Sequence, residues 1–237
     1  MTSRHFTLVE LLTVTVVMTI IIGATVSAYN HIMTGNAVSY GNRLITSELN
    51  MARTYACQKR RAIAVLFTSP DITYNPDVDE PVALRAYRCA YVEKSGSDWN
   101  FVEWVEQSQW KFLPRGAFFA TTDATQSDAK DADHGFRGSA TVKDVYDGIL
   151  KSDGTSIQES DNPLFHGKKD FKFAVIFRRN GRPVTTNGSP RVQVRQGVVT
   201  GNTDDEGMIA KLNADNYLVA QLNRYTGAVV TKSPEDY

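Results

Sequence analysis

The sequence predicts an α+β protein. One long N-terminal helix, transmembrane in its first half and amphipathic in its second, packs on a β-rich head of two antiparallel sheets. Three observations predict this fold. Residues 11–28 form an apolar run without a charged side chain. Residues 44–56 repeat apolar side chains at the spacing of one helical face. The remaining chain is divided into short β-branched and aromatic runs.

Length and charge bound the classes of protein that are possible. The chain has 237 residues, which suits one membrane segment and one globular head large enough to bury a core. Lys and Arg number 26, and Asp and Glu also number 26. The total charge therefore indicates neither a strongly basic nucleic-acid protein nor an acidic solvating tail.

The apolar N-terminal run is long enough to cross a membrane as a helix. Residues 6–28 would extend about 34 Å, against a bilayer core of about 30 Å. A cleaved signal peptide has a shorter apolar region, and a plain signal anchor has little use for Glu10 near the start of the run. An unpaired carboxylate at membrane depth costs at least ~2.5 kcal/mol. Glu10 therefore predicts a cationic partner at the same depth.

Residues 6–12 read Phe-Thr-Leu-Val-Glu-Leu-Leu and follow a short polar leader. This motif resembles the type III signal of type IV prepilins and pseudopilins. The resemblance implies that a prepilin peptidase cuts between His5 and Phe6 and methylates the new amino terminus of Phe6. It also implies that Glu10 pairs with the amino terminus of a neighbouring subunit during assembly. The family usually has Gly where this chain has His5, so a processed and an unprocessed N-terminus both stay open.

Further motifs resemble the FimT and GspH group of minor pilins and pseudopilins. They are Leu-x4-Leu-x-x-Ala-Arg-x-x-Ala from residue 44, Trp-Lys-Phe-Leu-Pro-Arg-Gly at 110–116, and the segments around Asn180-Gly181 and Thr226-Gly227. That group implies a long helix followed by two packed β-sheets. The expected boundaries are a prepilin leader at 1–5, a transmembrane helix at 6–29, an amphipathic helix at 30–61 and an extracytoplasmic head at 62–237.

Strands of the head are predicted at residues 62–67, 83–92, 100–106, 171–178, 191–199 and 217–222. Residues 95–98 predict a hairpin loop, and Asn180-Gly181 predicts a tight turn. Gly35 and Gly41 favour a kink or local melting of the helix. An insertion at about 121–170 is rich in Asp, Ser, Gly and Lys and contains a short helix candidate at 142–151. We expect it to be a surface excursion.

No catalytic constellation is found, so we expect no enzyme activity and no cofactor. His5, His31, His134 and His166 have no nucleophile motif beside them. Acidic groups at 71–80, 123–133 and 204–206 lack the spacing of an EF-hand. These acidic groups could bind calcium, but solvated loops are the simpler interpretation. No metal ligand is therefore predicted.

Cys57 and Cys89 are the two cysteines of the chain. Two cysteines exclude a disulfide-dense scaffold and a zinc site of paired Cys-x-x-Cys motifs. Either they form one bridge in an oxidising compartment, or they are two small buried thiols.

A basic region polarises the neutral chain. Residues 168–195 carry a net charge of plus seven, whereas residues 121–161 carry minus five. On a strand, Arg191, Gln193 and Arg195 would share one face. The candidates for a nucleic-acid or partner contact are Arg178, Arg179, Arg182, Arg191 and Arg195. The resembling group includes DNA-binding minor pilins. DNA binding therefore stays open beside a solvated basic face and a face that docks on the acidic insertion of the next subunit.

Together these observations predict a structural assembly subunit, a minor pseudopilin or minor pilin of a type II secretion or type IV pilus machine. The expected partners are other pilin subunits, prepilin peptidase and a membrane crossed once. The expected location is the inner membrane with the head outside the cytoplasm, then the pilus or pseudopilus. A DNA-binding minor pilin for DNA uptake is the alternative. A membrane-anchored enzyme or binding protein would instead show a pocket with convergent polar groups.

Overall fold

A computed structural model of the chain describes residues 8–69, 84–120, 138–150, 157–159, 164–165, 167–185, 188–203 and 207–236. In chain order the elements are α1 (Leu8–Lys59), β1 (Ile63–Phe67), β2 (Ala86–Ser95), β3 (Asp98–Trp104), β4 (Lys111–Phe112), β5 (Ala117–Phe119), β6 (Val142–Tyr146), β7 (Gly148–Leu150), β8 (Ile157–Glu159), β9 (Lys168–Phe171), β10 (Phe173–Phe177), β11 (Arg191–Thr203), β12 (Gly207–Leu222), β13 (Val229–Lys232) and the 3₁₀ helix η1 (Pro234–Asp236).

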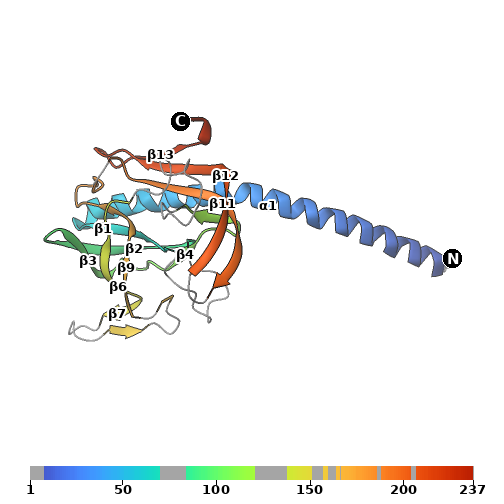
Figure 1. Ribbon diagram of the computed structural model, residues 1–237, viewed down its shortest axis with the longest axis horizontal. Helices are drawn as coiled ribbons and strands as arrows, with labels where there is room; N and C mark the ends of the chain where they lie inside the picture. Colours follow the sequence, from blue (N-terminus) through green and yellow to red (C-terminus); the bar gives the residue numbers. More distant parts are fainter. Residues whose placement is uncertain are drawn as a thin grey trace, which may run out of the picture.

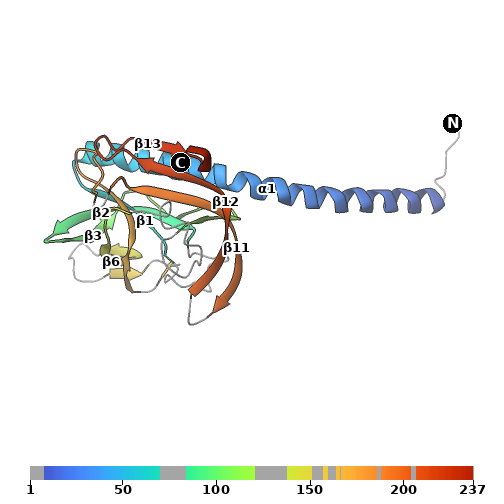
Figure 2. The ribbon, with the colours of Figure 1, turned by 45° about the horizontal axis from the view of Figure 1, so that its top comes forward.

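Helix α1 is continuous over 52 residues. It ends before Arg60, whose φ of 54° is the left-handed backbone that closes many helices. The helix continues through Gly35 and Gly41, so local melting at these glycines does not occur. Figures 1 and 2 show the second half of α1 inside the head and the first half projecting from it.

Gly41 marks the place where α1 enters the head. A Cβ atom at this position would lie 3.2 Å from Leu113 Cδ2 and 3.3 Å from Val194 Cγ1. The absence of a side chain therefore lets α1 approach β11 and the segment after β4. This close packing offsets the ~1 kcal/mol that glycine costs in a helix interior.

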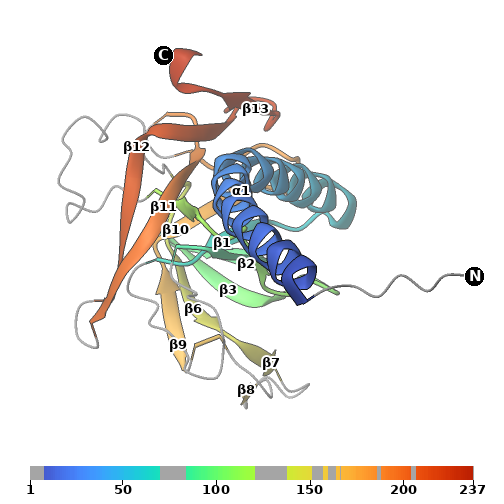
Figure 3. The same cartoon turned by 90° about the vertical axis from the view of Figure 1, so that its right-hand side faces the viewer.

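The strands of the described residues form three sheets. The largest has the order β10-β1-β2-β3-β6-β9, with β4 also paired to β2. Its pairs are antiparallel except for β3 and β6, which run parallel. The second sheet has the order β13-β12-β11-β5, and β7 pairs with β8. In Figure 3, α1 lies between the second sheet and the β1-β2-β3 part of the large sheet.

The part of the large sheet formed by β10, β1 and the first half of β2 is buried on both faces. Ile63, Val65 and Phe67 of β1 belong to the apolar cluster that also contains α1 and the second sheet. Ala64 and Leu66 point the opposite way and belong to a second cluster, which includes residues of the insertion. Burial on both faces explains why β1 is a continuous apolar run rather than an alternating one.

The second half of α1 supplies the centre of the first cluster. Ile45, Leu49, Ala52 and Ala56 are each at most 1 % exposed, which confirms most of the predicted apolar stripe. Leu44, the remaining member, is half-buried. The six predicted strands all coincide with observed strands, and the Ser95–Asp98 pair confirms the predicted β2–β3 hairpin.

The described part of the insertion is not a surface excursion. The predicted helix at 142–151 is instead occupied by β6 and β7, and β6 enters the large sheet between β3 and β9. Val142 and Val145 are fully buried. A register shift between them, with Asp144 at a φ of 58°, breaks the two-residue alternation of a strand. The two buried valines therefore lie three residues apart, which imitates helical spacing.

The predicted fold class is wrong as stated. In the part of the chain that the structure describes, no helix is both long and apolar enough to cross a membrane. The apolar stretch with described side chains covers residues 8–23, which is about 24 Å of helix against a bilayer core of about 30 Å. This finding contradicts the transmembrane helix at 6–29 and the single-pass inner-membrane location.

The head also departs from the predicted two antiparallel sheets. Strands β3 and β6 run parallel, and β7 and β8 form a third sheet.

The bridge between Cys57 and Cys89 is also absent. Both cysteines are free; Cys57 is exposed and Cys89 is buried. The Cys89 thiol donates a hydrogen bond to Glu48 Oε1 at 3.2 Å. Cys57 lies nine residues beyond Glu48 on α1, which is about 13.5 Å along the helix. That separation prevents Cys89 from reaching it.

Two turns cross closely beside α1, at residues 178–182 and 223–228. Gly181 and Gly227 adopt φ values of 74° and 71°. A Cβ atom on Gly227 would lie 2.3 Å from the backbone oxygen of Gly181. Arg53 of α1 also lies within 3.4 Å of the Cβ position of both glycines. Glycine is therefore required at position 227 for two reasons: its backbone is left-handed, and a Cβ atom would clash with the backbone of Gly181.

Replacing Gly227 by Ala is expected to lower the free energy of unfolding by about 3 kcal/mol or more, since left-handed strain adds to a clash with the backbone. Urea unfolding of the full chain measures this loss. Gly96→Ala is the matched control. Gly96 has a similar φ of 63° with nothing within 4 Å of its Cβ position, so only strain of about 1–2 kcal/mol is expected. Equal losses in the two variants would contradict the close crossing of the turns.

Candidate functional site

The first candidate site is the projecting half of α1, which we define as residues 8–23. Its large apolar side chains are exposed throughout, from 50 % at Val14 to 81 % at Leu8. Thr13, Thr15 and Thr19 donate hydrogen bonds to carbonyl oxygens of their own helix at 2.7–2.9 Å. The hydroxyls therefore need no outside partner, and the helix presents an apolar surface around its circumference.

Such a surface is unusual for a protein that acts alone. Monomeric soluble proteins rarely expose contiguous apolar patches larger than a few hundred Å², and larger patches mark interaction sites. A helix that is apolar all round is normally buried on all sides. The projecting half of α1 therefore has the character of a buried helix, although the head of the same chain does not cover it.

Glu10 interrupts this apolar surface in the first turn of α1. A carboxylate near a helix N-terminus interacts favourably with the helix dipole. The predicted cleavage site at His5 and Phe6 lies outside the described residues, so processing stays a prediction. The predicted pairing of Glu10 with a neighbouring amino terminus also stays a prediction, because it requires a second subunit.

A buried carboxylate fixes the second half of α1 on the large sheet. Glu48 is 5 % exposed. Lys111 Nζ binds Glu48 Oε2 at 2.6 Å, and Cys89 donates to the other oxygen. Burial, and then the Glu48 carboxylate, raises the pKa of the Cys89 thiol well above its usual value. The thiol therefore stays protonated and continues to donate its hydrogen bond to Glu48.

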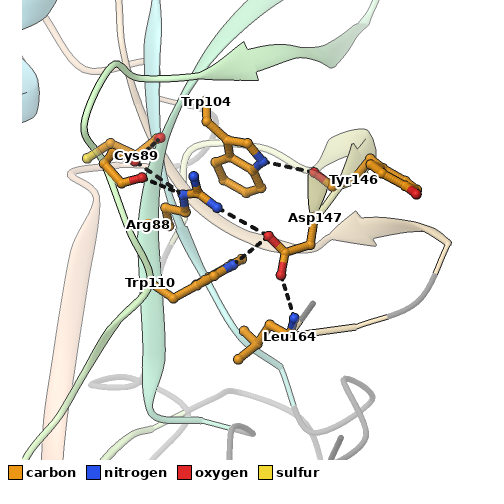
Figure 4. A network of polar contacts seen from close by, with 8 residues as sticks. Arg88, Cys89, Trp104, Trp110, Tyr146, Asp147 and Leu164 are labelled. Atoms are coloured by element: carbon orange, nitrogen blue, oxygen red, sulfur yellow. Dashed lines mark hydrogen bonds and ion pairs between the residues drawn. The ribbon is translucent and has the colours of Figure 1, made fainter. Parts of the chain in front are cut away.

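A second polar network ties the insertion to the large sheet (Figure 4). Arg88 of β2 binds Asp147, which follows β6, with 3.2 Å between Nη1 and Oδ1. Trp110 Nε1 donates to the same oxygen at 3.0 Å, and the backbone N–H of Leu164 donates to Asp147 Oδ2. The Arg88 guanidinium also lies 4.0 Å from the centre of the Trp104 ring. Residues far apart in the sequence thus meet at one ion pair.

This network has a structural character rather than a catalytic one. Asp147 is 3 % exposed, and both of its carboxylate oxygens accept hydrogen bonds. Burial lowers the pKa of Arg88 while Asp147 opposes that change. The buried pair therefore has its partners within the protein and offers no free group to a substrate.

The fold divides the predicted basic contact surface. The exposed members, in the turn after β10, are Arg178, Arg179 and Arg182. Arg191 is half-buried. Arg195 is only 2 % exposed, and its guanidinium lies 5.1 Å from the centre of the Tyr217 ring. The predicted basic face over residues 191–195 is not exposed as a whole, because Gln193 and Arg195 are buried.

A different set of cations surrounds a hollow at the C-terminal end of α1, which we call the tip hollow. Its volume is about 510 Å³, and its lining residues are Arg60, Arg61, Ala62, Val92, Glu93, Lys94, Trp99, Arg178 and Arg179. Arg61 is already engaged, at 2.5 Å from Glu103 and 4.0 Å from the centre of the Tyr91 ring. The sequence did not indicate this cluster, because it combines residues from three distant segments.

The described residues contain no group of three or more His, Cys, Asp or Glu side chains placed to hold a metal ion. Several predicted candidates lie outside the described residues: the acidic groups at 71–80, 123–133 and 204–206, His5, His134, His166 and the side chain of His31. Comparison with known proteins gives no match to a protein-family model, to a curated protein or to a solved structure. The resemblance to pilins therefore rests on the sequence motifs.

Replacing Asp147 by Asn is expected to lower the free energy of unfolding by about 3–5 kcal/mol, because it leaves Arg88 buried without its counter-charge. Thermal unfolding of the full chain measures the effect. Asp98→Asn is the matched control in the same sheet. The Asp98–Lys143 pair is closer, at 2.8 Å, but is 48 % and 43 % exposed, so the expected loss is at most ~1 kcal/mol. A loss as small for Asp147 as for Asp98 would show that the network does not hold the insertion.

Proposed function

We propose that this chain is an assembly subunit, a minor pilin or pseudopilin of a type IV pilus or type II secretion machine. The observation that carries this proposal is the projecting half of α1. Eleven large apolar side chains between Leu8 and Ile22 are at least 50 % exposed. The motif at residues 6–12 supports the same class, because it resembles a prepilin processing signal at the start of that helix.

Packing against other helices would stabilise the projecting half of α1. Burying one Val, Leu, Ile or Met side chain contributes about 1.5–3 kcal/mol. Because the apolar side chains surround the helix rather than form one stripe, a single partner helix would leave much of the surface exposed. The pattern favours a position within a bundle of several subunits.

Glu10 fits this bundle as a register-setting residue. A carboxylate enclosed by apolar helices is stable only when a cation lies against it. The resemblance provides that cation as the amino terminus of a neighbouring subunit after cleavage at Phe6. Glu10 lies in the first turn of α1, and this position supports a pairing between adjacent parallel helices.

The head would move as one body with α1. The same unbroken helix forms the projecting half and, through Ile45, Leu49 and Ala56, the centre of the apolar core. A shift of the helix within the bundle would therefore shift the head directly. This coupling suits a subunit whose helix is assembled while its head is presented at the surface of the assembly.

The alternative function, DNA binding through residues 168–195, is less well supported. Two of its five proposed arginines lie outside the exposed turn, and Arg195 is buried. An enzyme function is not favoured by the tip hollow, whose titratable lining groups are five cations and Glu93.

Intersubunit cross-linking tests the proposed function. In a Cys57→Ser background, Val17→Cys places a thiol on the projecting half, at a residue that is 54 % exposed. Mild oxidation in cells that produce the native machine is expected to give disulfide-linked adducts between subunits, detected by mass spectrometry. Thr54→Cys is the matched control, because Thr54 is exposed on the half of the same helix that lies in the head. Adduct formation that is absent or equal at the two positions would contradict the proposal.

A further inference from the structure

The tip hollow is a cationic site with an apolar floor. Arg60, Lys94, Arg178 and Arg179 line it, and none of these side chains forms an ion pair within the described residues. Glu93 is the one acid in the lining. The floor is formed by apolar side chains: Ala62, Val92 and Trp99. Such a hollow suits an extended peptide that carries several carboxylates and some apolar surface.

The chain itself contains a segment with this chemistry. Residues 70–83 include Asp71, Asp77, Asp79 and Glu80 and no Lys or Arg. The same segment has prolines at 70, 76 and 81 and a tyrosine at 74. Proline favours extended backbone with a low entropic cost of binding, and aromatic-lined sites bind such segments in other proteins. Charge and composition therefore match the tip hollow.

The two ends of this segment are held at the opposite end of the head. Beside them, the backbone N–H of Thr68 donates to Ala86 O at 3.0 Å, and that of Phe119 donates to Leu84 O at 2.8 Å. Leu113, which bonds to the backbone of Arg85, also packs on Gly41, where α1 enters the head. Arg60 of the tip hollow lies about 28 Å further along α1. In Figure 1 the β2–β3 hairpin beside the hollow is likewise at the end away from the N-terminus.

The segment cannot place its four carboxylates together in the hollow of its own chain. From Ser69 to Ala62, which lines the hollow, β1 extends about 23 Å. Glu80 is four residues from Leu84 and Asp71 is two residues from Ser69, so they reach at most about 14 Å and 7 Å from these ends. Asp79 reaches about 18 Å from Leu84. Asp77 alone could span the distance, and only if the backbone between it and Leu84 is fully extended. A second copy of the chain has no such restriction.

We propose that the tip hollow binds the acidic segment 70–83 of a second copy of this chain. The contact is head to tail, because the two complementary surfaces lie at opposite ends of the head. Repetition of such a heterologous contact builds a ring or an open chain of subunits rather than a two-fold dimer. The inference rests on the proposed assembly function and specifies which surfaces of neighbouring heads meet.

A cross-link between two differently tagged copies tests the contact in cells that produce the native machine. Both copies carry Cys57→Ser. One carries Ser97→Cys, in the exposed β2–β3 turn beside the hollow, and the other carries Thr73→Cys in the acidic segment. A mixed disulfide between the two tags is expected. Arg178→Glu with Arg179→Glu in the first copy, or Asp77→Lys with Asp79→Lys in the second, should each reduce its yield about tenfold. Combining both pairs should restore the yield to within about threefold.

The controls separate this contact from general charge effects and from the assembly function. Asp128→Asn with Asp131→Asn removes two acids elsewhere in the chain and should leave the yield unchanged. An equal decrease in that control, unchanged yields in the reversal variants, or no restoration on combining them would overturn the inference. A loss of duplex DNA binding in the arginine variant, with an unchanged yield of the cross-link, would also overturn the inference.

The two cross-links distinguish this inference from the proposed function. If the Val17→Cys adduct persists while the Ser97–Thr73 link is absent, this inference fails alone. If both are absent, the proposed function fails as well.

Discussion

The burial of one half of α1 between two sheets is the constraint on which the rest of the structure depends. Ile45, Leu49 and Ala56 contact apolar side chains of both sheets in one cluster. Gly41 allows the backbones to approach where the helix enters. Without the helix, the inner faces of both sheets would lose their common partner. The same backbone then continues out of the head, so the apolar projecting half is held in a fixed direction by the core.

Polar contacts define how the layers meet, while apolar burial supplies most of the stabilisation. Glu48 links α1 to the large sheet through Lys111 and Cys89. Arg88 and Asp147 link the sheet to the insertion on its other face. A buried ion pair adds little net stability over an apolar pair of the same shape. Its loss is costly, however, because one charge is left without a partner.

The sequence predicted those features that depend on local pattern. The strands and the apolar stripe from Ile45 to Ala56 follow from periodicity that is visible in one segment.

Features that depend on distant residues were missed. The β6 strand was predicted to be a helix because a register shift lets both Val142 and Val145 be buried, and a spacing of three residues is typical of a helical face. The burial of Arg195 was missed because alternation within β11 does not show whether the face that carries Arg195 is exposed. Asp147 was not recognised as a buried residue from the sequence, since its partner Arg88 lies 59 positions away. The tip hollow was missed for a similar reason, as Arg60, Lys94 and Arg178 come from separate segments.

The central claim is that the chain joins an assembly through its N-terminal helix after processing of the pilin type. The mass of the N-terminal peptide of the native protein tests this claim most directly. The account predicts a peptide that begins at N-methylated Phe6, even though His5 stands where the family usually has Gly. A peptide that begins at an intact Met1, or at a residue beyond Ala28, would contradict the account, because the helix would then lack the processed terminus or be absent.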